Sequence, residues 1–262
     1  EHMRQCAPHA AEFVPLRLTR LYVPGSLRVG EALPLPAETG AHIAKVLRAR
    51  SGDALVVFNG EGREYQGTID TVRGPRVSVL LTAECAVSRE SPLEVVLVQA
   101  IPRGDRMDFV VQKATELGVA RIVPVFAERS VVRLNERQQE SRLAHWRGVA
   151  ISACEQCGRN RLPAIEPPVE LITYLARRPA PALRLVLDPE GPAAPAAVVG
   201  SPVEISIGPE GGFSVQELEA MRLQGFSALR LGPRILRTET AALAALCFLQ
   251  MRHGDMSPDA PC

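Results

Sequence analysis

Two glycine-rich turns near the C-terminal end of the sequence could bind a ligand. The first, Gly208-Pro209-Glu210-Gly211-Gly212, follows an alternating apolar segment at 203–207. Gly211 and Gly212 have no Cβ, so a ligand can lie directly against backbone N–H groups there. The second turn, Gly232-Pro233, follows a short strand predicted at 228–231. Each turn leads into a predicted helix, and we expect the two turns to form opposite walls of one pocket.

Charged side chains close to these turns supply possible acid–base chemistry. They are Glu210, Arg234, Arg237 and Glu239. A carboxylate can take a proton, and a guanidinium can hold a phosphate or stabilise a developing anion. The alternative for Arg237 and Glu239 is a structural ion pair. The sequence leaves both interpretations open.

Regular elements must position these turns. Ser214-Val-Gln-Glu217 has the pattern of a capping box that begins a helix, and Thr238 or Thr240 is expected to cap the last helix. Buried strands are predicted at 93–101, 121–126 and 183–187, with helical segments between them. This alternation predicts an α/β fold with a mostly parallel sheet covered by helices on both faces. Ligands bind such sheets beyond the carboxyl ends of the strands.

The N-terminal part has a different texture. Short strands are predicted at 20–23, 54–58, 64–71 and 76–81, with a helix inserted at 38–50, and this spacing suggests a small barrel. We divide the chain into domains at 1–88 and 89–262. Basic residues that could meet RNA phosphates are Arg20, His42, Lys45 and Arg48 in the first domain, and Arg103, Arg106 and Arg129 in the second. For His42 the alternative is a partly buried structural histidine, and for the others a solvated basic face.

The motifs together resemble a known family. IGPEGGFS at 207–214, LRLG at 229–232 and ILRTETA at 235–241 are similar to the C-terminal signature of the SPOUT methyltransferases, and more narrowly to the ribosomal RNA small subunit methyltransferase E family. The similarity extends through HIAKVLR at 42–48, QKATELGV at 112–119, ERSVV at 128–132 and EQCGR at 155–159. One departure is Arg103-Gly-Asp-Arg106, which stands where the family often has lysines.

This resemblance implies an activity. Members methylate N3 of a uridine in bacterial 16S rRNA in the assembled small subunit, with S-adenosylmethionine as cofactor. It also implies an N-terminal PUA-like β-barrel that binds RNA, a C-terminal trefoil knot and a homodimer. The residues expected to bind the cofactor are Leu187, Ile207, Gly208, Pro209, Glu210, Gly211, Gly212, Leu231, Gly232, Ile235, Leu236, Arg237, Thr240 and Ala241.

Other functions fit less well. Cys154-x-x-Cys157 lacks the two further ligands that a zinc site needs, so we expect no metal. A nucleotide hydrolase using Glu210 and Glu239 would lack a phosphate-binding lysine or a metal-ligand cluster. The main alternative is a non-catalytic RNA-binding or ribosome-assembly protein, in which the barrel binds RNA and the C-terminal domain only dimerises.

Composition limits the class of protein. The 262 residues carry a net charge of +1 and are 46% hydrophobic, so any RNA contact must come from local basic clusters. Apolar runs fall short of a membrane span, and the cysteines are unevenly spaced, so we expect a cytoplasmic protein. The segment 240–252 is apolar almost all round, which suggests that a second copy of the chain covers one side of it.

Overall fold

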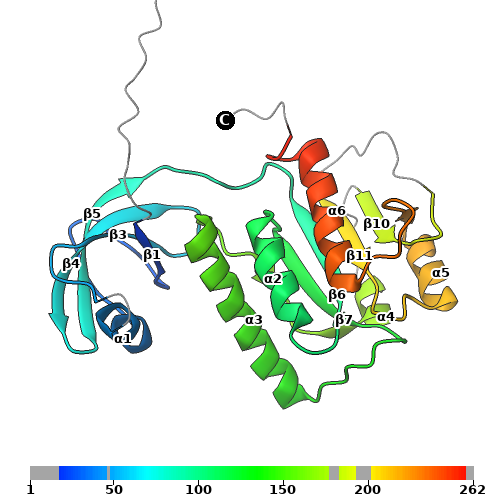
Figure 1. The fold of residues 1–262 in the computed structure, drawn as a ribbon, viewed down its shortest axis with the longest axis horizontal. Coiled ribbons are helices and arrows are strands. Elements are labelled where there is room, and N and C mark those ends of the chain that lie inside the picture. The colour runs from blue at the N-terminus through cyan, green and yellow to red at the C-terminus, as the bar shows by residue number, and fades with distance from the viewer. Residues whose placement is uncertain (1–17, 46–47, 177–182, 193–201, 258–262) are drawn as a thin grey trace, which may run out of the picture.

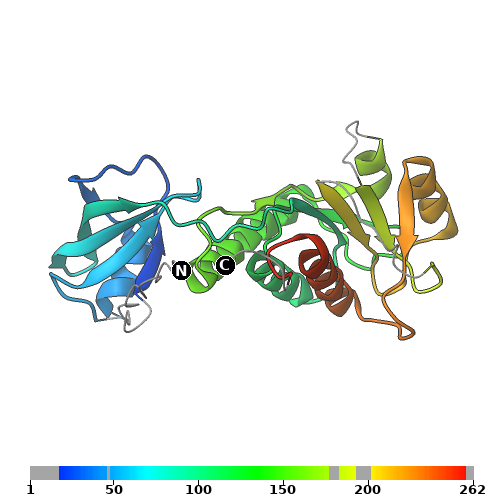
Figure 2. The same cartoon turned by 90° about the horizontal axis from the view of Figure 1, so that it is seen from above.

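A computed structural model describes residues 18–45, 48–176, 183–192 and 202–257. Figures 1 and 2 show a smaller sheet at one end of the molecule and a larger one at the other. The long helix α3 (Glu136–Cys157) reaches between them.

The smaller sheet is built from the N-terminal part. Its elements are β1 (Thr19–Tyr22), β2 (Ala32–Pro34), α1 (Ala37–Lys45), β3 (Ala54–Phe58), β4 (Glu64–Arg73) and β5 (Arg76–Cys85). The order is β1-β3-β4-β5-β2, with β1 parallel to β3 and the other pairs antiparallel. Ile43 of α1 packs into a core with Val57 and Val79. The predicted strands are therefore confirmed. The helix predicted at 38–50 is too long: α1 is described to Lys45, Val46 and Leu47 lie outside the described residues, and residues 48–50 are not helical.

The larger sheet contains seven strands within the described residues, and every strand pair in it is parallel. Its order is β12-β10-β11-β6-β7-β8, and β9 also pairs with β7. The elements are β6 (Val95–Ala100), α2 (Arg106–Glu116), β7 (Arg121–Phe126), α3, β8 (Ala164–Ile165), β9 (Val169–Glu170), α4 (Leu171–Leu175), β10 (Leu183–Leu187), β11 (Val203–Ile207), α5 (Val215–Leu223), β12 (Phe226–Leu229) and α6 (Thr238–His253).

Helices cover both faces of this sheet, as the alternation along β6 requires. Val95 and Leu97 face a core formed with α2, α3 and α6, whereas Val96 and Val98 face a second core formed with α4 and α5. Successive side chains of a strand point to opposite faces, so a strand buried on both sides is apolar throughout. The predicted α/β class is confirmed.

Two local predictions were wrong. The strand predicted at 228–231 is β12, which lies two residues earlier, so Arg230 and Leu231 belong to the following loop. Neither Thr238 nor Thr240 caps α6. The N-cap residue is Arg237, and no side chain caps the helix there. The Thr238 hydroxyl instead bonds to Gly208 O in the loop after β11.

Candidate functional site

A cavity of about 840 Å³ opens beyond the carboxyl ends of β10, β11 and β12. Its walls come from the loop after β10, the glycine turn after β11, and the segment 230–238 that leads into α6. Every residue that the sequence suggested for cofactor binding lines this cavity except Thr240, which is exposed on α6. Three of the four suggested catalytic residues also line it, namely Glu210, Arg234 and Arg237, while Glu239 does not.

The glycine turn presents bare backbone to the cavity. Gly212 has φ +68°, a conformation that L-residues adopt at a cost, and a Cβ added there would meet no atom within 4 Å. Gly232 on the opposite wall has φ +75° and the same open space. The Gly212 N–H donates to Pro209 O at 2.9 Å, which closes the turn. The space that side chains would fill is therefore available to a ligand.

The capping box predicted at the start of α5 is confirmed, and it also joins a second loop to the turn. Ser214 Oγ accepts from Glu217 N at 3.2 Å, and Ser214 N donates to Glu217 Oε2 at 2.8 Å. The other oxygen of this buried carboxylate accepts from Glu128 N at 2.8 Å. Arg129, the next residue, donates to Gly211 O at 3.1 Å, so the loop after β7 lies against the glycine turn.

A buried polar chain, which the sequence analysis missed, crosses from β6 to the cavity wall. Gln99 is fully buried and donates from Nε2 to Thr238 Oγ1 at 2.9 Å and to Ala100 O at 2.8 Å. Thr238 Oγ1 in turn donates to Gly208 O at 2.7 Å. A glutamine inside an apolar strand is the one sequence signal that could have indicated it, since buried polar groups need partners.

Two carboxylates and one arginine meet at the cavity edge. Arg106 Nη1 lies 2.9 Å from Glu210 Oε1, and Arg106 Nε lies 3.8 Å from Glu239 Oε1. Burial raises the pKa of the Glu210 carboxyl, but hydrogen bonds from its own N–H and from Arg103 N, with the charges of Arg106 and Arg103, bring it below its ordinary value. Glu210 is therefore ionised at neutral pH. The structural pair expected between Arg237 and Glu239 is absent among the described residues, because Glu239 turns to Arg106 instead.

The structure divides the basic residues predicted to bind RNA. Arg20 must be corrected, because its side chain is only 11% exposed and its guanidinium is bonded to Glu64 and Asn160. His42 is exposed, so its interpretation as a partly buried structural histidine was wrong. Lys45, the last residue of α1, and Arg48, three residues further along the chain, are also exposed. Arg103, Arg106 and Arg129 all bond to the glycine turn, and Arg106 and Arg129 also line the cavity.

Cysteine chemistry has no support at the described positions. Cys154 is buried on α3, and burial raises the pKa of its thiol to about 12. Across the part of the chain that the structure describes, no three His, Cys, Asp or Glu residues are grouped so that they could hold a metal ion. Nor does any described helix have the length and apolar character needed to cross a membrane.

Comparisons with known proteins agree with this geometry. The chain matches the RNA methyltransferase domain family over residues 89–250 and the RNA methyltransferase PUA domain over residues 35–76. A putative methyltransferase from Legionella pneumophila, solved with the cofactor SAM, is 42% identical with a TM-score of 0.88, covering 92% of this chain and 100% of that one. The ribosomal RNA small subunit methyltransferase E of Neisseria gonorrhoeae, bound to S-adenosyl methionine, is 37% identical with a TM-score of 0.86 at the same coverage. The protein of that name from Buchnera aphidicola is 33% identical over 92% of this chain and 99% of its own length.

Proposed function

Because the chain belongs to the ribosomal RNA small subunit methyltransferase E family, we propose that it methylates N3 of a uridine in bacterial 16S rRNA within the assembled small subunit. Its general activity is methyl transfer from S-adenosylmethionine to ribosomal RNA. The observation that carries the proposal is the cavity at the ends of β10, β11 and β12, which residues of the family's motifs line on two sides.

The cavity fits the cofactor in shape and charge. S-adenosylmethionine, when bound, supplies a methyl group on a cationic sulfonium, beside an ammonium, a carboxylate and an adenosine. At Gly212 and Gly232 the absence of a side chain leaves open space against the backbone, where a ligand can lie. Carboxylates of Asp188 and Glu190 and several guanidiniums line the same cavity, so both charges of a zwitterion find opposite partners.

The target atom requires help from the protein. Uracil N3 carries a proton at neutral pH and becomes a good nucleophile only when that proton leaves. Arg234 and Arg237 line the cavity with exposed side chains, and we assign to them the stabilisation of the uracil anion. Glu210 and Glu239, which share Arg106, are the carboxylates that we propose for proton removal.

We further propose that the protein works as a homodimer. On α6 the side chains of Ala241, Ala245, Leu246 and Leu249 face the protein's own core. The opposite side carries the half-buried Leu243, Ala244 and Cys247 and the exposed Met251, all apolar. Ile235, before the helix, is 86% exposed. A second copy of α6 would cover this stripe.

Several finer features follow the family. We propose that the chain divides into a PUA-like RNA-binding domain at 1–88 and a SPOUT domain at 89–262, and that the loops after β10, β11 and β12 form its trefoil knot. The exposed residues His42, Lys45 and Arg48 would hold the RNA backbone, and Arg103, Arg106 and Arg129 would meet RNA at the cavity. Ribosomal RNA as substrate favours the cytoplasm as the place of action.

Two measurements test the proposal. Calorimetry should show S-adenosylmethionine binding, and small ribosomal subunits that lack the modification should gain one N3-methyluridine, read by mass spectrometry of nuclease fragments. Binding without methylation of any ribosomal RNA would overturn the proposed substrate. No heat on addition of the cofactor would favour a non-catalytic RNA-binding protein instead.

A further inference from the structure

The segment 155–161, which we call the junction segment, joins the two sheets by polar contacts. It contains the end of α3 and the loop that follows it. Glu155 Oε1 accepts from Tyr22 N of β1 at 3.0 Å, and Asn160 O accepts from Gly62 N at 3.0 Å. Arg161 forms an isolated antiparallel bridge with Glu61. The segment thus bonds to three places in the N-terminal part of the chain.

Arg20 and Glu64 form the buried centre of this contact. The Arg20 guanidinium donates to Glu64 Oε2 at 2.6 Å, to Asn160 Oδ1 at 2.6 Å and to Arg159 O at 3.3 Å. Arg89, from the connection between the sheets, donates to the same Glu64 oxygen and to Gly158 O, both at 3.1 Å. The Glu64 carboxylate therefore accepts hydrogen bonds from Arg20 of β1 and from Arg89 of the connection. Arg20 also bonds to the junction segment.

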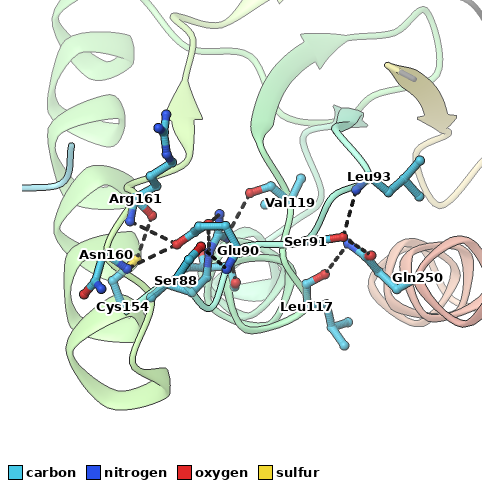
Figure 3. Close-up of polar contacts among 12 residues, drawn as sticks. Ser88, Glu90, Ser91, Leu93, Leu117, Val119, Cys154, Asn160, Arg161 and Gln250 are labelled. Atoms are coloured by element: carbon cyan, nitrogen blue, oxygen red, sulfur yellow. Dashed lines mark hydrogen bonds and ion pairs between the residues drawn. The ribbon is translucent and has the colours of Figure 1, made fainter. Parts of the chain in front are cut away.

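Arg159 and Glu90 fix the other side, as Figure 3 shows for Glu90, Asn160 and Arg161. Arg159, only 5% exposed, holds Glu90 Oε2 with Nε at 3.0 Å and Nη2 at 2.7 Å. Its third nitrogen donates to Thr115 O and Val119 O in the larger domain, both at 2.9 Å. Glu90 Oε1 accepts from the backbone N–H groups of Asn160 and Arg161 at 3.1 Å each. Both oxygens of Glu90 and all three nitrogens of the Arg159 guanidinium therefore have a partner.

The network lies outside the apolar cores of both sheets. The apolar core of the smaller sheet is formed by residues within 21–81, and the two cores of the larger domain begin at Leu93 and at Val96. The connection at 86–92 contains no helix or strand. Burying several charges together is costly unless their geometry is fixed, and its best-attested return is specificity of arrangement. Here the arrangement that it specifies is the angle between the domains.

We propose that the junction segment is a clamp that holds the smaller sheet at one fixed orientation to the methyl-donor cavity, with Arg20, Arg159 and Asn160 as positioning residues for methylation of ribosomal RNA. The inference rests on the proposed function, because a fixed angle matters only when one domain holds the RNA that the other modifies. A displacement of the target by about 1 Å can cost roughly a hundredfold in rate.

Arg20→Met tests the clamp without leaving a buried charge alone, since Glu64 keeps Arg89. The matched control is Arg63→Met, which removes one positive charge and one ion pair; the Arg63 side chain is 67% exposed and bonds to Glu84, not to the junction segment. The rate of trypsin cleavage after Arg89 measures how firmly the two domains are held together. Calorimetry measures the affinity for S-adenosylmethionine and so tests whether the cavity is intact. Methylation of small subunits reports the reaction.

With Arg20→Met we expect faster cleavage after Arg89, unchanged S-adenosylmethionine affinity, and kcat/KM for the ribosomal particle lower by roughly ten- to a hundredfold. Arg63→Met should match the wild type in all three.

Cleavage and kcat/KM at wild-type values in Arg20→Met would overturn the clamp, as would an equal loss in both variants, which would mark a simple charge effect. If Arg20→Met does not fold, Asn160→Ala, which removes an acceptor of Arg20, is measured in the same way. Should even the wild type fail to methylate RNA, the proposed function falls, while the cleavage rates still decide the clamp.

Discussion

Thr238 donates its hydroxyl to the carbonyl oxygen of Gly208 at 2.7 Å, and this bond ties together the two walls of the cavity. One wall is the glycine turn after β11, and the other is the start of α6. Gln99 in the sheet below holds the same hydroxyl from the other side. The width of the cavity thus depends on a threonine whose sequence position suggested an ordinary helix cap.

Thr238→Val should weaken cofactor binding more than it weakens the fold. The substitution keeps the shape of the side chain but removes the donor to Gly208 O and one of the two acceptors of Gln99 Nε2, at a cost of about 1–3 kcal/mol. The dissociation constant for S-adenosylmethionine, measured by calorimetry, should rise roughly tenfold or more. Thr115→Val is the control, because Thr115 is also buried and its hydroxyl bonds to Val111 O within α2. An equal loss of affinity in the control would contradict a local role for Thr238.

Gly212→Val should abolish cofactor binding. Valine must adopt φ +68° at a cost of about 1–2 kcal/mol, and its side chain would enter space that the structure leaves open to a ligand. Gly225→Val has the same strain, with φ +83° and open space, but lies outside the cavity. Both variants should melt a few degrees below the wild type, and only Gly212→Val should give no heat with S-adenosylmethionine. A normal affinity of Gly212→Val for S-adenosylmethionine would show that Gly212 serves only to form the turn.

Glu210→Gln should lower stability in a pH-dependent way. The ionised carboxylate is bonded to Arg103 N and paired with Arg106, and these partners place its pKa below the ordinary 4.5. The stabilisation is therefore fully present above pH 4.5 and is lost as the pH falls through the lowered pKa. At pH 7, urea unfolding should show Glu210→Gln less stable by about 1 kcal/mol, since the site is partly exposed. The difference should shrink steadily below pH 4.5, and a constant difference would show that the charge is not its cause.

Leu243→Glu should separate the homodimer. Leu243 belongs to the apolar outer stripe of α6, and a charge there would be buried without a partner in a dimer. Light scattering should give twice the 28.3 kDa chain mass for the wild type and the single mass for the variant. Leu223→Glu on α5, where the side chain is 71% exposed, is the control and should stay dimeric. A wild-type protein of 28.3 kDa at micromolar concentration would rule the dimer out.

Lys45→Glu with Arg48→Glu should weaken RNA binding and flatten its salt dependence. Both side chains are exposed, Lys45 at the end of α1 and Arg48 beyond it. Each lost phosphate contact lowers the slope of log K against log salt by roughly one. Cofactor affinity should not change, because neither residue lines the cavity. Arg137→Glu with Arg142→Glu on α3 makes the same change of charge at two other exposed positions. Equal effects of the two pairs would mean that only net charge is being measured.

Local patterns predicted the fold well, and contacts between distant residues set the limit. The strands, the capping box at Ser214 and Glu217 and the glycine turn depend on neighbours within a few residues, so they are legible in the sequence. Arg20 was misread because its partner Asn160 lies 140 residues further along the chain. Glu239 was misread for the same reason, since Arg106 comes from another helix. The sequence alone does not distinguish an arginine that binds RNA from one that pairs with a buried carboxylate.

The position of β11 in the larger sheet has a consequence for how the protein is made. β11 lies between β10 and β6, and its Val203 pairs with Val95 across all the intervening chain. Pairings so distant in sequence form slowly, because a long loop must close first. During synthesis the smaller sheet can close once β5 has emerged, whereas the cavity must wait until Ala241 has been added. A nascent chain that stops before α6 would thus carry a finished N-terminal sheet beside an unfinished larger domain, with the apolar sheet face that α6 covers exposed to aggregation.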